Sequence, residues 1–323
     1  MMRNKLAAKR SSLSGDTIQQ LIVLTFFALM LAFFGAKSKY FLAWKNICSM
    51  LIALVPLGLI TVSEACLLTA GEWDMSNGHL ASLSGMLWAY LITSCGMNVW
   101  LAFVIALLVG VVSGFCNGFL VTRFSIPAWM ASYSILMVLQ SLTYIISDGV
   151  AISLKEYETV KILGQTKVFG TEITVAVVIM FAVIAVMWFL LKYSQLGRNM
   201  YVVGGNREAA ANVGINVGAI KMFAFILSGV LSALAGLLCA SRSATAQVSV
   251  CSLGAMNAIA ASIVGGASLG GGKANIVMAI VGAMIITGMQ SGLNMIGVPS
   301  FYQYMVTGVA LFLAVLVQSE RRK

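Results

Sequence analysis

Charged residues are scarce in this 323-residue chain. Asp, Glu, Lys and Arg together make up 9 % of it, whereas a soluble domain carries about 25 % of such residues. Proline occurs three times, and the 31 glycines follow no three-residue period, which excludes disordered and collagen-like chains. Hydrophobic residues, by contrast, make up 60 % of the sequence. This composition excludes a water-soluble globular enzyme. It indicates a protein with at most about ten membrane spans, since each span takes some 20 residues.

The chain has a single histidine and no closely spaced pair of cysteines. His79 is the only histidine, and the six cysteines stand apart without a C-x-x-C pair. This pattern favours buried, apolar cysteines over a zinc site or a disulfide framework. An enzyme embedded in the membrane would need a nucleophile with a base, or a set of metal ligands. One histidine with scattered acids supplies neither, so we expect no catalytic residues and no metal site.

The phosphate-binding loop of ATPases is incomplete as well. GGGK at 270–273 resembles the end of that loop, whose pattern is G-x-x-x-x-G-K-[ST]. Ala267 occupies the first glycine position, and Ala274 follows the lysine. Because the first glycine and the magnesium-binding hydroxyl are both absent, we expect this chain not to hydrolyse ATP by that route.

Basic residues gather at both ends of the chain. Elsewhere they form no dense run, which argues against a nucleic-acid partner despite a net charge of +10. The apolar run at about 18–35 is longer than the core of a signal peptide and is expected to be an uncleaved span. Positive residues are retained on the cytoplasmic side. Both termini are therefore expected inside, which requires an even number of spans.

The sequence contains ten apolar segments, which agrees with an even number of spans. They cover residues 18–36, 47–70, 79–96, 99–121, 126–147, 172–192, 219–240, 253–268, 274–291 and 301–318. Threading them places thirteen of the twenty basic residues inside. We predict an all-α fold with one transmembrane domain at 18–318, cytoplasmic tails at 1–17 and 319–323, and a cytoplasmic loop at about 193–219. The glycine cluster at 265–272 is either a broken, re-entrant segment or a tight turn.

Polar residues interrupt the apolar sequence within the second predicted span and directly after it. Glu64 lies within that span, where an ionisable residue usually faces a cavity or a partner. It is interpreted either as a cavity-lining or structural group or as a proton carrier. The segment GEWDMSNGH at 71–79 follows. Its carboxylates, amide and indole suit a polyhydroxylated ligand, although Ser, Asn and Gly also favour an ordinary turn.

The stretch at 197–221 predicts a short helix outside the membrane. Asn206 can cap a helix that begins near Arg207, and Gly214 can end it. Such a helix is either a docking element for a partner or a solvated loop helix.

At this stretch the sequence resembles a known family. GGNREAAANVGINV at 204–217 is similar to the cytoplasmic loop of permease subunits in ATP-driven sugar importers of the ribose, xylose and galactose type, including their "EAA…G" coupling element. GFCNGFLVTRFSIPAW at 114–129, AIAASIVGGASLGGGKA at 258–274 and SGLNMIGVPSFYQYMVTGVALFLAVLV at 291–317 resemble further segments of the same family. The matches occur in order and cover nearly the whole chain after residue 45.

One segment departs from the family pattern. Where the family usually reads G-G-I-D-L-S-V-G, this chain has GEWDMSNG at 71–78. Glu72, Trp73 and Asn77 replace small or aliphatic residues, which leaves the substrate preference open. Milder changes are Ala274 after the lysine and Ser132 in place of threonine.

The resemblance implies an inner-membrane permease of about ten spans that contains broken or re-entrant segments. Two copies, identical or homologous, would pair around one pathway and dock on a cytoplasmic ATPase with two nucleotide-binding domains, which binds ATP and Mg. A periplasmic or lipid-anchored binding protein would deliver the solute. The expected coupling residues are Gly205, Asn206, Arg207, Glu208, Ala209, Ala210 and Gly214. The expected pathway residues are Glu64, Glu72, Trp73, Asp74, Ser76, Asn77 and Asn117.

Two alternatives remain open at this point. A proton-coupled secondary transporter would use Glu64 and need no ATPase. A permease of the same family could also carry a nucleoside, a polyol or a branched-chain amino acid.

Overall fold

The computed structural model describes residues 15–168 and 170–299, and most positions from 301 to 312. Its membrane-length helices are α1 (Gly15–Lys37), α2 (Trp44–Thr69), α4 (Val99–Arg123), α5 (Ala128–Ser147), α7 (Val175–Tyr193), α10 (Val217–Ser243) and α12 (Ile276–Met295). Shorter helices are α3 (Asn77–Thr93), α6 (Glu158–Gln165), α8 (Gln195–Gly205), α9 (Arg207–Asn212) and α11 (Gly254–Val264). The two-residue strands β1 (Ile152–Ser153) and β2 (Thr245–Ala246) pair antiparallel.

The predicted all-α, polytopic class is confirmed, but fewer helices than expected have the length of a full span in the part of the chain that the structure describes. Among the described residues, seven helices are long and apolar enough to cross a membrane. Predicted spans 79–96 and 253–268 form the 17-residue α3 and the 11-residue α11, which are shorter than the roughly 20 residues of a full crossing. The polar segment at 71–76 precedes α3, and two glycines at 265–266 follow α11. The predicted span 301–318 and the predicted terminal tails lie largely outside the described residues.

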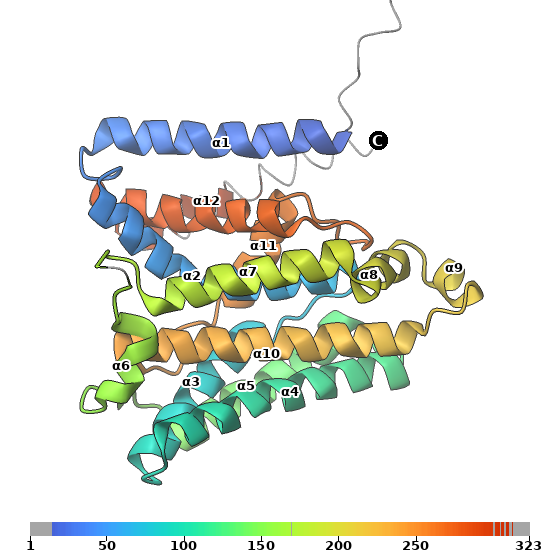
Figure 1. Ribbon diagram of the computed structural model, residues 1–323, viewed down its shortest axis with the longest axis horizontal. Helices are drawn as coiled ribbons and strands as arrows, with labels where there is room; N and C mark the ends of the chain where they lie inside the picture. Colours follow the sequence, from blue (N-terminus) through green and yellow to red (C-terminus); the bar gives the residue numbers. More distant parts are fainter. Residues whose placement is uncertain are drawn as a thin grey trace, which may run out of the picture.

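Helices α2 and α10 form the centre of the molecule (Figure 1). In their most apolar windows 72 % and 67 % of residues are buried, against 17 % for α1. Small residues permit this close packing. A Cβ atom at Gly110 of α4 would lie 2.5 Å from the carbonyl oxygen of Gly229 of α10. The two backbones therefore cross almost in contact.

The molecule has two distinct ends (Figure 1). Helices α8 and α9 lie at one end, and α6 lies at the other. The β1–β2 pair belongs to the α6 end, because Ile152 and Ala246 pack in one cluster with Val160 of α6. The start of α1 belongs to the α8 end, because Gln19 and Gln20 line a cavity of about 250 Å³ together with Tyr201 and Lys273.

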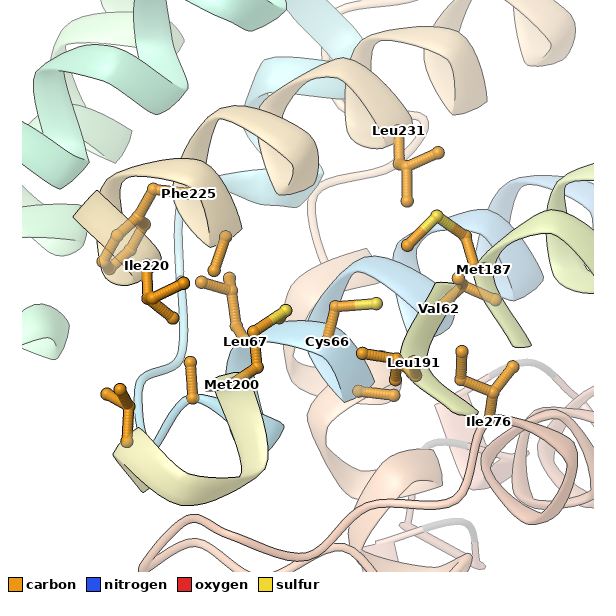
Figure 2. Packing of buried hydrophobic residues seen from close by; sticks show 14 of the residues in the cluster. Val62, Cys66, Leu67, Met187, Leu191, Met200, Ile220, Phe225, Leu231 and Ile276 are labelled. Carbon is orange, nitrogen blue, oxygen red and sulfur yellow. The ribbon is translucent and has the colours of Figure 1, made fainter. Parts of the chain in front are cut away.

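A buried apolar cluster packs the α8 end (Figure 2). Val62, Cys66 and Leu67 of α2 meet Met200 of α8 and Phe225 of α10 in this cluster. Its other labelled members are Met187, Leu191, Ile220, Leu231 and Ile276. Helix α8 is therefore fixed against the central helices by apolar burial.

Candidate coupling and translocation site

A buried polar cluster lies where the segment between α2 and α3 crosses the molecule. We use this name for Glu64, Asp74, Ser76, Asn77 and Asn117 together with Ser63 and Ser228. All seven side chains are buried. Five of them are predicted pathway residues, and the fold brings those five together from α2, α4, the segment at 71–76 and the start of α3.

Glu64 is held from two directions. Its Oε1 accepts a hydrogen bond from Nδ2 of Asn77 at 2.6 Å, and its Oε2 accepts one from the backbone N–H of Asp74 at 3.3 Å. The hydroxyl of Ser228 in α10 donates to Oδ1 of Asn77 at 3.2 Å, and Nδ2 of Asn77 also donates to Oγ of Ser63 in α2 at 3.4 Å. Asn77 thus joins three elements at one point.

Asp74 is the second buried carboxylate. Its Oδ1 accepts hydrogen bonds from the backbone N–H and the hydroxyl of Ser76, at 2.7 and 2.6 Å. Its Oδ2 accepts one from Nδ2 of Asn117 in α4 at 3.0 Å. Next along the chain, the backbone N–H of Met75 donates to Oγ of Ser132 in α5 at 3.1 Å. The segment is therefore anchored on both α4 and α5.

The cluster is satisfied mainly by hydrogen bonds. Among the described residues, neither Glu64 nor Asp74 forms a salt bridge, and Oδ1 of Asn117 is buried without a hydrogen-bond partner. Such an arrangement rigidifies a protein interior because each partner depends on the others. Two pathway candidates lie outside this cluster. Trp73 is only partly buried, and Glu72 pairs with Arg207 and Lys221 instead.

Glu72 forms ion pairs at the α8 end. Its Oε1 lies 2.7 Å from Nη2 of Arg207, the first residue of α9, and 2.7 Å from Nζ of Lys221 in α10. Sequence reasoning placed Glu72 with the pathway residues and did not single out Lys221. The pairing joins positions 135 residues apart, and no local pattern signals such a contact.

The short helix predicted to begin near Arg207 forms where the sequence places it. Helix α8 ends at Gly205, and the side chain of Asn206 caps α9 by accepting from the backbone N–H of Ala209 at 2.9 Å. Ala210 is buried in the apolar cluster of Figure 2, whereas Glu208 and Ala209 are exposed. The chain then turns at Gly214, whose φ of +82° suits glycine. Helix α9 therefore presents an exposed face on a fixed base.

Tyr201 ties α8 to the turn before α12. Its hydroxyl donates to the carbonyl oxygen of Ala274 at 2.8 Å. Partial burial raises the pKa of this phenol above its ordinary value, because the charged form loses hydration. A phenol is protonated at neutral pH even at its ordinary pKa of about 10, so this hydrogen bond persists there.

Comparison with known proteins identifies the class. The family described as branched-chain amino acid transport system / permease component matches residues 46–315. The chain is 34 % identical to a ribose import permease protein of Bacillus subtilis, over 87 % of each chain. It is 32 % identical to an L-arabinose ABC transporter permease protein of Azospirillum brasilense, over 92 % of this chain and 86 % of the relative.

A third relative is a D-allose transport system permease protein of Escherichia coli, which is 33 % identical over 90 % of this chain and 89 % of its own. No solved structure matches the chain. The chain belongs to this family of ABC-importer permeases, and the resemblance inferred from its motifs is confirmed.

Proposed function

We propose that this protein is the inner-membrane permease subunit of an ATP-driven importer for a sugar or sugar-like solute. The proposal follows the relatives, whose names specify ribose, L-arabinose and D-allose. The observation that carries the coupling part is α9, an exposed helix on a buried base at one end of the molecule. A helix of this kind offers an ATPase a rigid projection to hold.

The mechanism is alternating access driven by a partner. An ATPase with two nucleotide-binding domains closes on ATP and Mg and moves α9, with Glu208 and Ala209 on the contact face. A second permease copy or a homologue pairs with this chain, and the two rock around a shared pathway. The coupling requires an element with two states that ATP and solute both bias.

The buried polar cluster belongs to the closed state in this proposal. Its carboxylates and amides are engaged with one another, so a sugar would meet them only when the helices separate. A periplasmic or lipid-anchored binding protein delivers the sugar from outside. Both termini and α9 face the cytoplasm.

The test is uptake in proteoliposomes that contain this chain, its ATPase and its binding protein. A mixture of radiolabelled D-ribose, L-arabinose and D-allose is offered with and without ATP. We expect ATP-dependent uptake that disappears without the binding protein. Glu208→Arg reverses a charge on the exposed face and is expected to lower uptake at least about tenfold, because truncating a central interface contact commonly costs 2 kcal/mol or more.

A proton-coupled secondary transporter, the alternative function, would give a different result in the same uptake experiment. Glu64 is a buried carboxylate without a salt bridge among the described residues, as a proton carrier would be. Uptake that persists without ATP and collapses with a protonophore would contradict the importer and favour proton coupling through Glu64.

A further inference from the structure

Glu72 connects the start of α9 with α10. Its Oε1 accepts from Arg207 at the first position of α9 and from Lys221 in the second turn of α10, both at 2.7 Å. Arg207 also donates to the carbonyl oxygen of Gly71 at 3.2 Å. Any displacement of α9 therefore changes contacts with the segment at 71–76, which carries Asp74 two residues beyond Glu72.

The two cations differ in their surroundings. The side chain of Lys221 is 9 % exposed and that of Glu72 is 7 % exposed, whereas that of Arg207 is 55 % exposed. Water can replace the partner of Arg207 at little cost, whereas leaving one charge of the mostly buried Glu72–Lys221 pair without its partner is costly. Lys221 is therefore the fixed partner, which keeps the charge of Glu72 compensated, and Arg207 is the partner that can leave and return.

Backbone packing supports the same connection. A Cβ atom at Gly204, at the end of α8, would collide with the carbonyl oxygen of Thr69 at the end of α2 and would lie 2.6 Å from the backbone N of Gly272. The N–H of Gly272 donates to that same Thr69 carbonyl at 3.2 Å. The ends of α2 and α8 are thus in direct backbone contact with the turn before α12.

A buried ion pair is weak evidence for a role in stability, because apolar residues often replace one without loss. A buried ion pair can instead hold the chain segments that carry it in one relative arrangement. Here the Lys221 pair fixes the 71–76 segment relative to α10, and the Arg207 pair connects the same segment to α9.

We propose that Glu72 is a positioning residue for transport. It transmits movement of α9 to the 71–76 segment through Arg207, while Lys221 keeps its charge compensated. This inference rests on the proposed function. It assigns Glu72 a role in coupling in place of contact with the solute.

The test compares sugar uptake with ATP hydrolysis in the complete reconstituted complex. Glu72→Gln keeps the size of the side chain and removes its charge. We expect the number of sugars imported per ATP hydrolysed to fall roughly tenfold, within the range typical of coupling between separate sites. The substrate mixture is radiolabelled D-ribose, L-arabinose and D-allose. The matched control is Glu172→Gln, which removes an exposed carboxylate paired with Lys167 at the opposite end and is expected to import as the wild type does.

A second variant separates coupling from folding. Arg207→Gln changes a half-exposed residue, so the complex should assemble with an unchanged unfolding temperature while the import-to-hydrolysis ratio falls. Arg207→Lys should restore most of the ratio. The double variant E72Q/R207Q should be no worse than E72Q, because both changes break the same link.

Two results would overturn the inference. One is a wild-type import-to-hydrolysis ratio in Glu72→Gln or in Arg207→Gln. The other is found if both variants have a lowered unfolding temperature and lose uptake and ATP hydrolysis in equal proportion. If the wild-type complex itself imports no sugar with ATP, the proposed function fails and this inference fails with it. A coupled wild type with an equally coupled E72Q removes only the role of Glu72.

Discussion

At the scale of single residues, Asn77 holds the buried polar cluster together. Its amide contacts Glu64, Ser63 and Ser228, so its removal leaves Glu64 with only the backbone N–H of Asp74 as a donor in the cluster. Asn77→Ala is expected to lower the free energy of unfolding by about 1–3 kcal/mol, the cost of leaving buried polar groups unpaired. Denaturation in mixed detergent micelles measures this change.

The matched control for that variant is Asn212→Ala, which removes the same amide from an exposed position on α9. It should change the free energy of unfolding by no more than about 0.5 kcal/mol, as is usual for surface substitutions. Equal stability of the two variants would mean that the hydrogen bonds of Asn77 do not hold the cluster.

At the scale of elements, the junction of α2, α8 and the turn before α12 depends on glycine. Gly204→Ala is expected to destabilise the protein by about 1–3 kcal/mol, because overpacking forces the backbone apart and the new methyl would meet the backbone of Thr69 and Gly272. Gly205→Ala is the control, since a Cβ atom there meets nothing within 4 Å. If the two alanines have equal effects on unfolding in detergent, the three segments are not in backbone contact.

The elements also show what the sequence could predict. Helix α9 was predicted from local signals, since its Asn206 cap and its glycine stop act within a few residues. The extents of α3 and α11 were overestimated, because a run of apolar residues does not reveal whether a helix crosses the membrane or is packed inside the protein.

In the candidate site, too, some residues could be found from the sequence and others could not. Asp74, Asn77 and Asn117 could be singled out from the sequence because polar residues are rare in apolar sequence, and the structure places them in one buried cluster. Their role in the pathway stays a prediction. Ser63 and Ser228 were not, since a serine in an apolar helix usually bonds to its own backbone. The link from Glu72 to Arg207 and Lys221 depends on three-dimensional contacts that no spacing encodes.

At the scale of the whole molecule, the proposed coupling requires α9 to face the cytoplasm and the α6 end to face outward. The turn between α3 and α4 belongs to the α6 end, because Met97 and Val99 pack in one cluster with Leu154 and Val160. Cys95 in this turn is exposed. Labelling of Cys95 therefore probes the α6 end, and labelling of a cysteine at position 212 on α9 probes the α8 end.

This orientation predicts opposite labelling of two cysteines. A membrane-impermeant maleimide should label Cys95 in spheroplasts, and Cys95→Ser should abolish that labelling, because the other cysteines among the described residues are buried or only partly exposed. In the Cys95→Ser background, Asn212→Cys should be labelled in inside-out vesicles and not in spheroplasts. The reverse pattern would place α9 outside the cell, where a cytoplasmic ATPase cannot reach it. Both the proposed coupling and the role of Glu72 would then fail on topology alone, whatever the uptake measurements gave.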